Sequence, residues 1–337
     1  MIVSWLATNE CNLKCLHCYQ DAGDIKGQEL TTAQAKKLID EIVKAGFKIM
    51  IFSGGEALMR PDIFELVSYA SKSGLRPVLG TNGMLITLEV AQKLKSCGAM
   101  AMGISLDSLD REKHDKFRGD ANAHRLTIEG MENCKKAGLP FQIHTTVMQW
   151  NQDEVCSITD FAVQIGAIAH YIFFLIPVGR GIYIEETSLE VLENEKLLRE
   201  IMAKQKEVPI DIKPTCAPQF VRVAKQMGIE TRFSRGCLAG ITYCIIDPTG
   251  EVKPCAYMVE EVGNVKETPF DEIWKNSPLF NKLRTQKYSG ACEKCDYKLE
   301  CGGCRARAGY YNNGDYMAED SYCAHGKELI DKELEAS

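Results

Sequence analysis

The stretch Thr8-Asn9-Glu10-Cys11-Asn12-Leu13-Lys14-Cys15-Leu16-His17-Cys18-Tyr19 carries more information than any other part of this chain. Its cysteines have the spacing C-x3-C-x2-C, which places three thiolates on one short loop. A 4Fe–4S cubane normally takes four thiolate ligands, so this loop would leave one iron without a protein ligand. An open iron can chelate a small molecule, which indicates chemistry at the cluster rather than electron storage. A structural zinc loop is the alternative, although this spacing is unusual for zinc.

The composition is that of an ordinary globular protein with room for one large and one smaller domain. Its 337 residues are 45% hydrophobic and 26% charged. The net charge of −6, without any Lys/Arg-rich block, argues against a nucleic-acid partner. There is no apolar run of about eighteen residues to predict a membrane span, and no secretory signal pattern at the N-terminus. Fifteen cysteines without an export signal indicate reduced thiolates for metal binding and a cytoplasmic location.

The first half of the chain alternates between short apolar runs and amphipathic stretches of helical length. The six expected strands are Val3–Thr8, Lys48–Phe52, Pro77–Gly80, Met100–Ser105, Gln142–Val147 and His170–Leu175. The expected helices between them are Thr32–Ala45, Pro61–Ser73, Leu88–Cys97, Arg125–Ala137 and Glu154–Ile165. This alternation predicts an α/β fold with a parallel sheet and right-handed crossovers. A doubly wound sheet and a barrel look alike at this level, and both gather ligand sites at the carboxyl ends of their strands.

The cysteine loop, closed by the aromatic Tyr19 and placed directly after the first strand, resembles the signature of the radical S-adenosylmethionine (SAM) enzymes. The resemblance implies that the amino and carboxylate groups of SAM occupy the open iron. It further implies that an electron from the cluster cleaves SAM to methionine and a 5′-deoxyadenosyl radical. The fold it implies is a partial (β/α)6 barrel. We therefore expect a radical SAM barrel over residues 1–185, a helical bridge over 186–232 and a cysteine-rich domain over 233–337.

Polar residues follow four successive strands, counting the cysteine loop itself. After the second strand, Gly54-Gly55-Glu56 lets the backbone approach a ligand closely and supplies a carboxylate for an ammonium group. Taken alone, such segments are equally well explained as turns, and Arg118 as a surface residue. In the resemblance, Glu56 corresponds to a contact of the SAM amino group and Arg118 to a partner of its carboxylate. The expected SAM-contacting residues are Tyr19, Gly54, Gly55, Glu56, Thr81, Asn82, Ser105, Asp107 and Arg118.

The last third of the chain is rich in cysteine, with eight thiols in two interleaved groups. They suffice for two further clusters, and the paired C-x2-C units also fit zinc ribbons. Their order and gaps resemble the SPASM domain, a small iron–sulfur domain appended to many radical SAM enzymes. The resemblance assigns to a nearer auxiliary cluster Cys237, Cys244, Cys255 and Cys304. It assigns to a farther cluster Cys292, Cys295, Cys301 and Cys323. The last pair is C-x2-C where C-x3-C is commoner, so we expect one or two auxiliary clusters.

Four cysteines lie outside both patterns. Cys97, Cys134 and Cys156 fall on expected helices and are explained as small buried apolar residues. Cys216 lies in Lys-Pro-Thr-Cys-Ala-Pro-Gln at the start of an expected helix, where the helix dipole would favour a thiolate. Packing is the simpler explanation for Cys216. A catalytic role at the substrate site is the alternative, because partly exposed thiols of low pKa are the functional ones.

Three segments resemble the tetrapyrrole-modifying subgroup of the family: Ser4-Trp5, residues 235–240 and residues 301–320. This subgroup includes the enzymes of heme d1 biosynthesis and of an alternative heme pathway. The resemblance implies removal of propionate or acetate side-chain carbons from a siroheme-derived tetrapyrrole, with the electron supplied by an external donor such as a flavodoxin or ferredoxin. A substrate with several carboxylates requires cations, and arginine suits bidentate binding of carboxylates. The candidates are Arg180, Lys213, Arg222, Arg232, Arg235, Arg305 and Arg307.

Two other functions stay open at this point. One is a radical SAM/SPASM maturase of a ribosomal peptide. Many maturases carry an N-terminal peptide-binding element, for which we expect no room before Cys11. The other is a non-catalytic iron–sulfur electron carrier, against which the open iron site and the glycine-rich strand ends argue. Cleavage of SAM by the reduced protein would separate an enzyme from a carrier.

Overall fold

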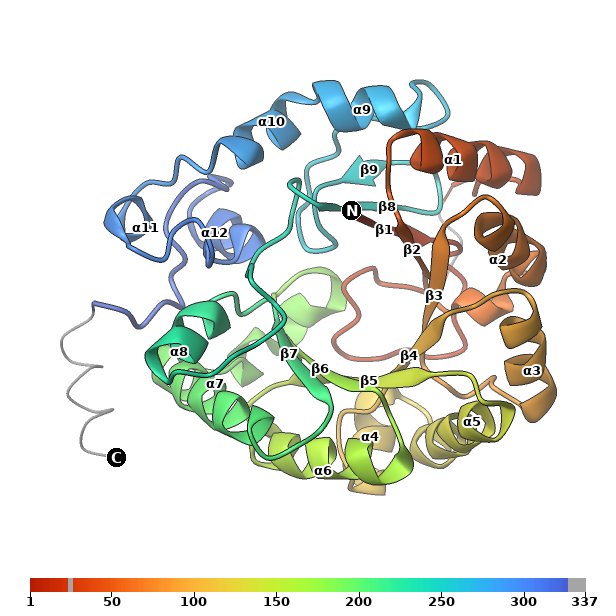
Figure 1. The fold of residues 1–337 in the computed structure, drawn as a ribbon, viewed down its shortest axis with the longest axis horizontal. Coiled ribbons are helices and arrows are strands. Elements are labelled where there is room, and N and C mark those ends of the chain that lie inside the picture. Colours follow the sequence, from red (N-terminus) through yellow and green to blue (C-terminus); the bar gives the residue numbers. More distant parts are fainter. Residues whose placement is uncertain (24–26, 327–337) are drawn as a thin grey trace.

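One curved sheet organises the computed structural model, which describes residues 1–23 and 27–326 (Figure 1). Its nine strands lie in the order β7-β6-β5-β4-β3-β2-β1-β8-β9, and every neighbouring pair except β8 and β9 is parallel. The strands are β1 (Ile2–Leu6), β2 (Ile49–Ser53), β3 (Arg76–Thr81), β4 (Ala101–Ser105), β5 (Phe141–Val147), β6 (Ala169–Phe174), β7 (Asp211–Thr215), β8 (Tyr243–Ile246) and β9 (Val252–Lys253).

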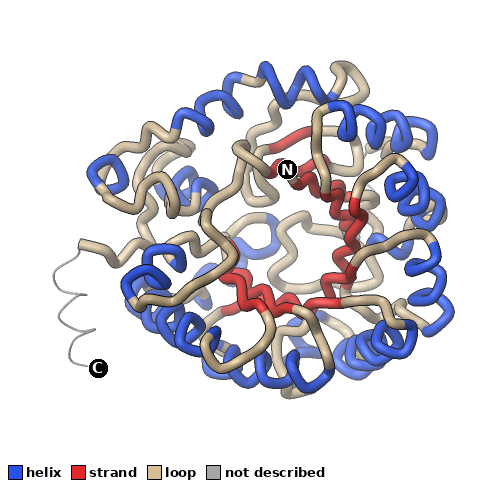
Figure 2. Tube along the Cα trace, in the orientation of Figure 1, coloured by secondary structure: helices blue, strands red, loops and turns tan. Residues whose placement is uncertain are grey.

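Helices cover the outer side of this sheet, while the cysteine loop lies inside its curve (Figures 1 and 2). The α-helices of the first two thirds are α1 (Thr32–Lys44), α2 (Ile63–Lys72), α3 (Leu88–Ser96), α4 (Arg111–Arg118), α5 (Ala123–Ala137), α6 (Val155–Ile165), α7 (Val191–Gln205) and α8 (Phe220–Gln226). Those of the last third are α9 (Phe270–Asn276), α10 (Pro278–Thr285), α11 (Ala291–Lys294) and α12 (Arg305–Tyr311). Short 3-10 turns are η1 (Ala57–Met59), η2 (Gln152–Glu154) and η3 (Gly179–Thr187). None of the described helices is long and apolar enough to cross a membrane.

The six strands expected from the sequence are confirmed as β1 to β6, and the partial barrel is confirmed with them. Alternate strand residues explain the layering, because successive side chains point to opposite faces. Ile104 and Ile143 are fully buried in the core between the sheet and its helices. Residues of the opposite parity therefore line the inside of the curve. Strand register joins Ser105, His144, Tyr171 and Lys213 into one row on this face, called the inner row below.

The bridge expected over residues 186–232 is not purely helical. It contains α7 and α8, but between them β7 pairs with β6 and extends the sheet by one strand. The sequence analysis did not predict this strand because it contains Pro214. Proline donates no ladder hydrogen bond, so it argues against the interior of a strand. In the described sheet β7 is an edge strand, where a missing N–H is tolerated.

The cysteine-rich third also contributes to the sheet. Its strand β8 pairs in parallel with β1, in the register Val3↔Cys244 and Trp5↔Ile246. The Tyr243 hydroxyl donates a 3.0 Å hydrogen bond to Ser4 Oγ on the inner face. The strand that leads into the cysteine loop is therefore held between β2 on one side and a strand of the C-terminal third on the other.

Candidate active site

The three thiols of the first loop lie together directly beyond β1. Those of Cys11, Cys15 and Cys18 are near enough to interact electrostatically. Backbone N–H groups of Leu13 and Ala22 donate to Cys11 Sγ and Cys18 Sγ, each at 3.4 Å. Burial raises the pKa of the Cys11 thiol to about 11, so metal binding must displace its proton. Three thiols with N–H donors on one loop fit a 4Fe–4S cluster that keeps one iron open.

Two glycines allow the loop after β2 to pack on the backbone of the cysteine loop. The Gly55 N–H donates to the Thr8 carbonyl at 2.8 Å, and the Glu56 N–H donates to the Glu10 carbonyl at 2.8 Å. A Cβ atom on Gly55 would overlap the Glu10 carbonyl oxygen, and one on Gly54 would overlap that of Thr8. These glycines are thus required by the fold itself, whereas their contact with SAM stays a prediction.

The Glu56 carboxylate joins the end of β2 to the end of β3. Thr81 Oγ1 donates to its two oxygens at 2.9 and 3.0 Å, and the Asn82 N–H donates to Oε2 at 2.9 Å. Glu56 is fully buried, and burial raises its pKa. Asn82 Nδ2 in turn donates to Asn12 Oδ1 of the cysteine loop at 2.7 Å. The structure therefore brings Glu56, Thr81 and Asn82 together beside the loop, and their expected contacts with SAM stay predictions.

Arg118 is fixed between Asp107 and the cysteine loop. Its Nε and Nη2 donate to Asp107 Oδ2 at 2.7 and 2.6 Å, and its Nη1 lies 3.8 Å from Cys15 Sγ. The Thr146 N–H donates to the other carboxylate oxygen of Asp107 at 2.9 Å. Asp107 is fully buried, so the pair forms where water screens it little. Arg118 is thus a buried cation beside Cys15, and not the surface residue of the alternative interpretation.

Arg180, which the sequence analysis offered as a candidate cation for a substrate carboxylate, instead contacts the backbone of the cysteine loop. Arg180 donates through Nε to the Cys15 carbonyl at 2.8 Å and through Nη1 to the Ala22 carbonyl at 2.9 Å. Its backbone N–H donates to the Cys18 carbonyl at 2.9 Å. A Cβ on Gly179 would lie 2.6 Å from the Tyr19 carbonyl carbon, so glycine permits this approach. The Gly-Arg pair after a strand end was the available sequence signal. Arg180 therefore orders the cysteine loop.

The remaining candidate cations divide sharply by their partners. Arg222 forms a buried ion pair with Glu195, and Arg307 with Asp320. Arg232 lies on the surface, 2.8 Å from Asp211. Lys213 differs from these three, because within the described residues its ammonium has no hydrogen bond or ion pair and instead faces the rings of Tyr171 and Phe233 at 5.4 and 4.9 Å. Arg235 likewise has no ion pair among the described residues, and its buried Nε has no hydrogen-bond partner. A half-buried cation without a carboxylate partner carries a desolvation cost, which marks Lys213 as a candidate ligand for an anion.

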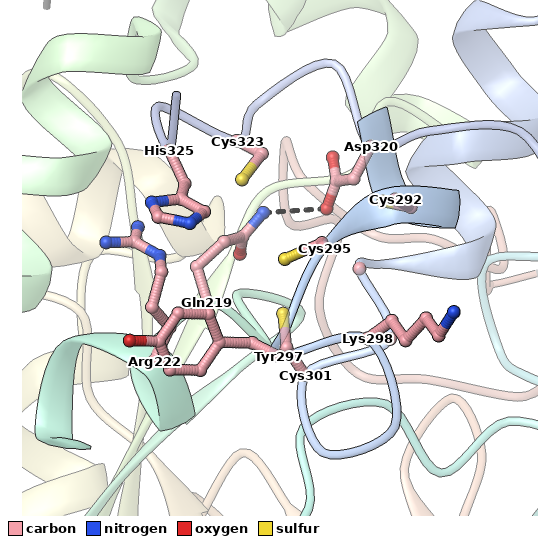
Figure 3. Close-up of a pocket in the computed structure, with 12 residues that line it drawn as sticks. Gln219, Arg222, Cys292, Cys295, Tyr297, Lys298, Cys301, Asp320, Cys323 and His325 are labelled. Atoms are coloured by element: carbon pink, nitrogen blue, oxygen red, sulfur yellow. Dashed lines mark hydrogen bonds between the residues drawn. The ribbon is translucent and has the colours of Figure 1, made fainter. Parts of the chain in front are cut away.

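The four cysteines expected to hold the farther cluster line one cavity, shown in Figure 3. They are Cys292, Cys295, Cys301 and Cys323. Gln219, Arg222, Asp320 and His325 complete much of the wall. In the described part of the chain, no three His, Cys, Asp or Glu side chains converge tightly enough to hold a single metal ion. The thiols are arranged around a volume rather than at a point, which fits a multi-iron cluster.

The short spacing Cys301-Gly-Gly-Cys304 separates its two cysteines into different groups. Gly302 and Gly303 have φ values of 71° and 59°, a left-handed turn that glycine adopts readily. Cys301 consequently faces the cavity of Figure 3, whereas Cys304 packs with Cys237 and Cys255. The departure from the commoner spacing therefore preserves the division between the two groups.

Two cysteines are placed differently from the sequence expectations. Cys244 was assigned to the nearer group, but its thiol lies in the core between the sheet and the helices. Cys216 was expected at a helix start with a lowered pKa. In the structure α8 begins only at Phe220, and burial raises the Cys216 pKa well above its usual value. The helix dipole therefore does not act on this thiol, and the expected thiolate of low pKa is wrong.

Comparison with known proteins agrees with this geometry. The radical SAM superfamily matches residues 5–162, and SPASM, an iron–sulfur cluster-binding domain, matches residues 237–296. The AdoMet-dependent heme synthase of Methanosarcina barkeri is 41% identical over 338 residues, 96% of this chain and 96% of that protein. Mycofactocin maturase MftC of Mycobacterium ulcerans is 32% identical over 333 residues, 96% and 88% of the two chains. Native anSMEcpe with bound AdoMet and Cp18Cys peptide shares the fold, with a TM-score of 0.74 at 19% identity over 99% of this chain and 97% of that one.

These matches cover the barrel and the cysteine-rich third together. The radical SAM domain brings with it a 4Fe–4S cluster and SAM, and the SPASM domain brings auxiliary iron–sulfur clusters. The thiol groups described above are the expected ligands of both kinds of site. The chain therefore belongs to the radical SAM superfamily and carries its SPASM domain, and its sequence groups it with the AdoMet-dependent heme synthases.

Proposed function

We propose that this enzyme removes propionate or acetate side-chain carbons from a siroheme-derived tetrapyrrole in heme biosynthesis. The observation that carries the proposal is the 41% identity with the AdoMet-dependent heme synthase of Methanosarcina barkeri, over 96% of both chains. When bound, the open cluster and SAM supply a 5′-deoxyadenosyl radical that takes a hydrogen atom from the substrate. The electron comes from a flavodoxin or ferredoxin.

The inner face of the barrel offers what a flat polycarboxylate requires. Tyr171 and Phe173 present aromatic surface, and His144 stacks on Tyr171 with ring centroids 5.6 Å apart. Lys213, next to Tyr171 in the inner row, supplies a cation whose charge no described carboxylate neutralises. An anionic side chain of the substrate would offset the desolvation cost of this ammonium group. We propose Lys213 as the anchor of one substrate carboxylate.

Arg118 and Asp107 hold one side of the SAM pocket in this proposal. Asp107 orients the Arg118 guanidinium, and Arg118 is the partner of the SAM carboxylate. Glu56 holds the Thr81-Asn82 turn at the next strand end, where it contributes to the site of the amino group. Ser105 lies in the inner row and faces the same interior.

The test is mass spectrometry of the anaerobically reconstituted, reduced protein given SAM and a panel of siroheme-derived macrocycles. Loss of a side-chain fragment together with 5′-deoxyadenosine formation is the expected result. Deoxyadenosine without any change in a macrocycle would overturn the substrate assignment. The peptide-maturase function would then come first, supported by the 32% identity with mycofactocin maturase MftC. Absence of SAM cleavage by protein with fully loaded clusters would support the electron-carrier alternative.

A further inference from the structure

Four cysteines from distant parts of the chain form one group close to the inner row. Cys216 follows the edge strand β7, Cys237 precedes β8, Cys255 follows β9, and Cys304 precedes α12. All six pairs among these thiols are close enough to interact electrostatically. They also pack in a single apolar cluster with Tyr257 and Met258. Cys292 of the farther group packs against the same cluster, so the closeness of the four thiols to one another, and not the packing alone, defines the group.

Cys244 is not part of this group. It lies on the outer face of β8, opposite Val3 in the register, and is fully buried in the core beneath the helices. The Cys244 thiol interacts electrostatically with Arg284 and with none of the other cysteines. To reach them, Cys244 would have to turn to the other face of β8. A strand paired on both sides cannot make that turn without losing its register.

The segment that carries Cys216 is fastened to the segment that carries Cys304. Arg307 Nη2 donates to the Cys216 carbonyl at 2.9 Å. Asp320 Oδ2 accepts from Gln219 Nε2 at 2.8 Å and from the Cys304 N–H at 2.7 Å. Asp320 is buried, so these bonds are not exchanged freely with water. The two thiols are consequently held in fixed relative positions.

The backbone conformation of Cys216 is a further indication that its thiol has a functional role. Its φ is 62°, a left-handed conformation in which glycine is favoured and a residue with a Cβ is uncommon. Such strain persists where the surroundings fix it, and it concentrates at functional sites. Glycine would adopt this conformation at a lower backbone cost, but glycine has no thiol.

We infer that Cys216, Cys237, Cys255 and Cys304 are the ligands of the nearer auxiliary cluster, with Cys216 in the place assigned to Cys244 by the commoner pattern. Each thiol gives up its proton when it binds iron. The ligand set then includes one residue of the barrel edge, three positions after Lys213. The inference concerns cluster ligation and does not depend on the identity of the substrate.

The test uses the full-length chain in which Cys11, Cys15 and Cys18 are all changed to Ala, so that only auxiliary clusters remain. In this background, Cys216→Ala, Cys216→Gly and the matched control Cys244→Ala are reconstituted anaerobically. Iron and sulfide are counted per chain, and the spectrum of the reduced clusters is recorded by electron paramagnetic resonance. The thermal midpoint of each metal-free chain checks folding.

Both Cys216 variants are expected to lose about four iron atoms per chain, or to keep them with a changed resonance that responds to added imidazole. Cys244→Ala should match the background in iron content and spectrum. Cys216→Gly relieves the left-handed backbone but leaves the volume of the packed side chain empty, so a thermal midpoint of the metal-free Gly variant near that of the parent shows that its loss of iron does not come from misfolding. Unchanged iron content and spectrum in both Cys216 variants would overturn the inference.

Discussion

The rings of Tyr19 and Tyr257 lie with their centroids 5.3 Å apart, so the loop of the first cluster touches the segment that carries Cys255. Tyr19 follows Cys18 directly, and Tyr257 comes two residues after Cys255. Burial raises the pKa of Tyr19 to about 12, so its hydroxyl stays protonated at neutral pH. This neutral aromatic contact is where the radical SAM loop meets the nearer cysteine group.

Changing Tyr257 to Leu should uncouple SAM cleavage from product formation. The substitution removes an aromatic contact worth about 0.5–1.5 kcal/mol and opens space between the two sites. The ratio of 5′-deoxyadenosine to product should therefore rise, and Tyr257→Phe, which keeps the ring, should retain the parent ratio. Equal coupling in the Leu and parent enzymes would show that the contact has no part in the reaction.

Changing Cys11, Cys15 or Cys18 to Ala should abolish SAM cleavage, because each removes a ligand of the cluster that binds SAM. Changing Cys292 or Cys323 to Ala should spare SAM cleavage but abolish product, since these thiols line the separate cavity of Figure 3. Chromatographic quantification of 5′-deoxyadenosine and of product distinguishes loss of SAM cleavage from loss of product alone. Loss of both activities in the Cys292 variant would contradict the division of roles.

Asp107→Asn should weaken SAM binding as well as stability, because it leaves the buried Arg118 without its charge partner. Breaking a buried ion pair costs about 3–5 kcal/mol. Glu195→Gln is the matched control, since it breaks the buried Glu195–Arg222 pair far from the cysteine loop in the sequence. Both variants should lower the thermal midpoint, but only Asp107→Asn should raise the SAM concentration needed for half-maximal cleavage. If the Asp107→Asn variant bound SAM normally, the assignment of Arg118 to the SAM pocket would be wrong.

Buried histidines should make the protein less stable in mild acid. Burial lowers the pKa of His144 to about 4 and of His170 to about 3, whereas both have a pKa near 6.5 when unfolded. The stabilisation is therefore complete above pH 6.5 and is lost as the pH falls toward the folded values, by up to about 1.4 kcal/mol per histidine and pH unit. The thermal midpoint of the metal-free chain, measured from pH 7.5 to 4.5, should fall less steeply in His170→Gln. If the thermal midpoint fell with pH equally steeply in His170→Gln and in the parent, His170 would not be a source of the acid sensitivity.

Lys213→Met should raise KM for the macrocycle by about 10- to 100-fold while SAM cleavage in the absence of substrate is unchanged. The change keeps the length of the side chain but removes the charge that binds a substrate carboxylate. Lys72→Met, at the end of α2 on the outer side of the barrel, is the control. If Lys213→Met bound every macrocycle as well as the parent does, the anchor would have to lie elsewhere.

The sequence predicted the barrel well because its strands and helices carry clear local signals. It missed β7, where Pro214 removes a ladder donor at a position that only an edge strand tolerates. The resemblance to the SPASM domain grouped the four cysteines that line the cavity in Figure 3, but it placed Cys244 rather than Cys216 in the nearer group. Whether Cys216 or Cys244 belongs to the nearer group depends on which face of β8 each side chain of that strand occupies. It also depends on contacts between segments almost a hundred residues apart. The local spacing of cysteines predicts neither.

The pairing of β1 with β8 also has a consequence for the order in which the protein can be completed. The hydrogen bond from Tyr243 to Ser4 spans 239 residues of sequence. One edge of β1 thus stays open during synthesis until β8 has been made, and an open edge is a template for wrong pairing. Truncation before β8 would expose that edge permanently. The C-terminal third therefore protects the strand that leads to the cysteine loop.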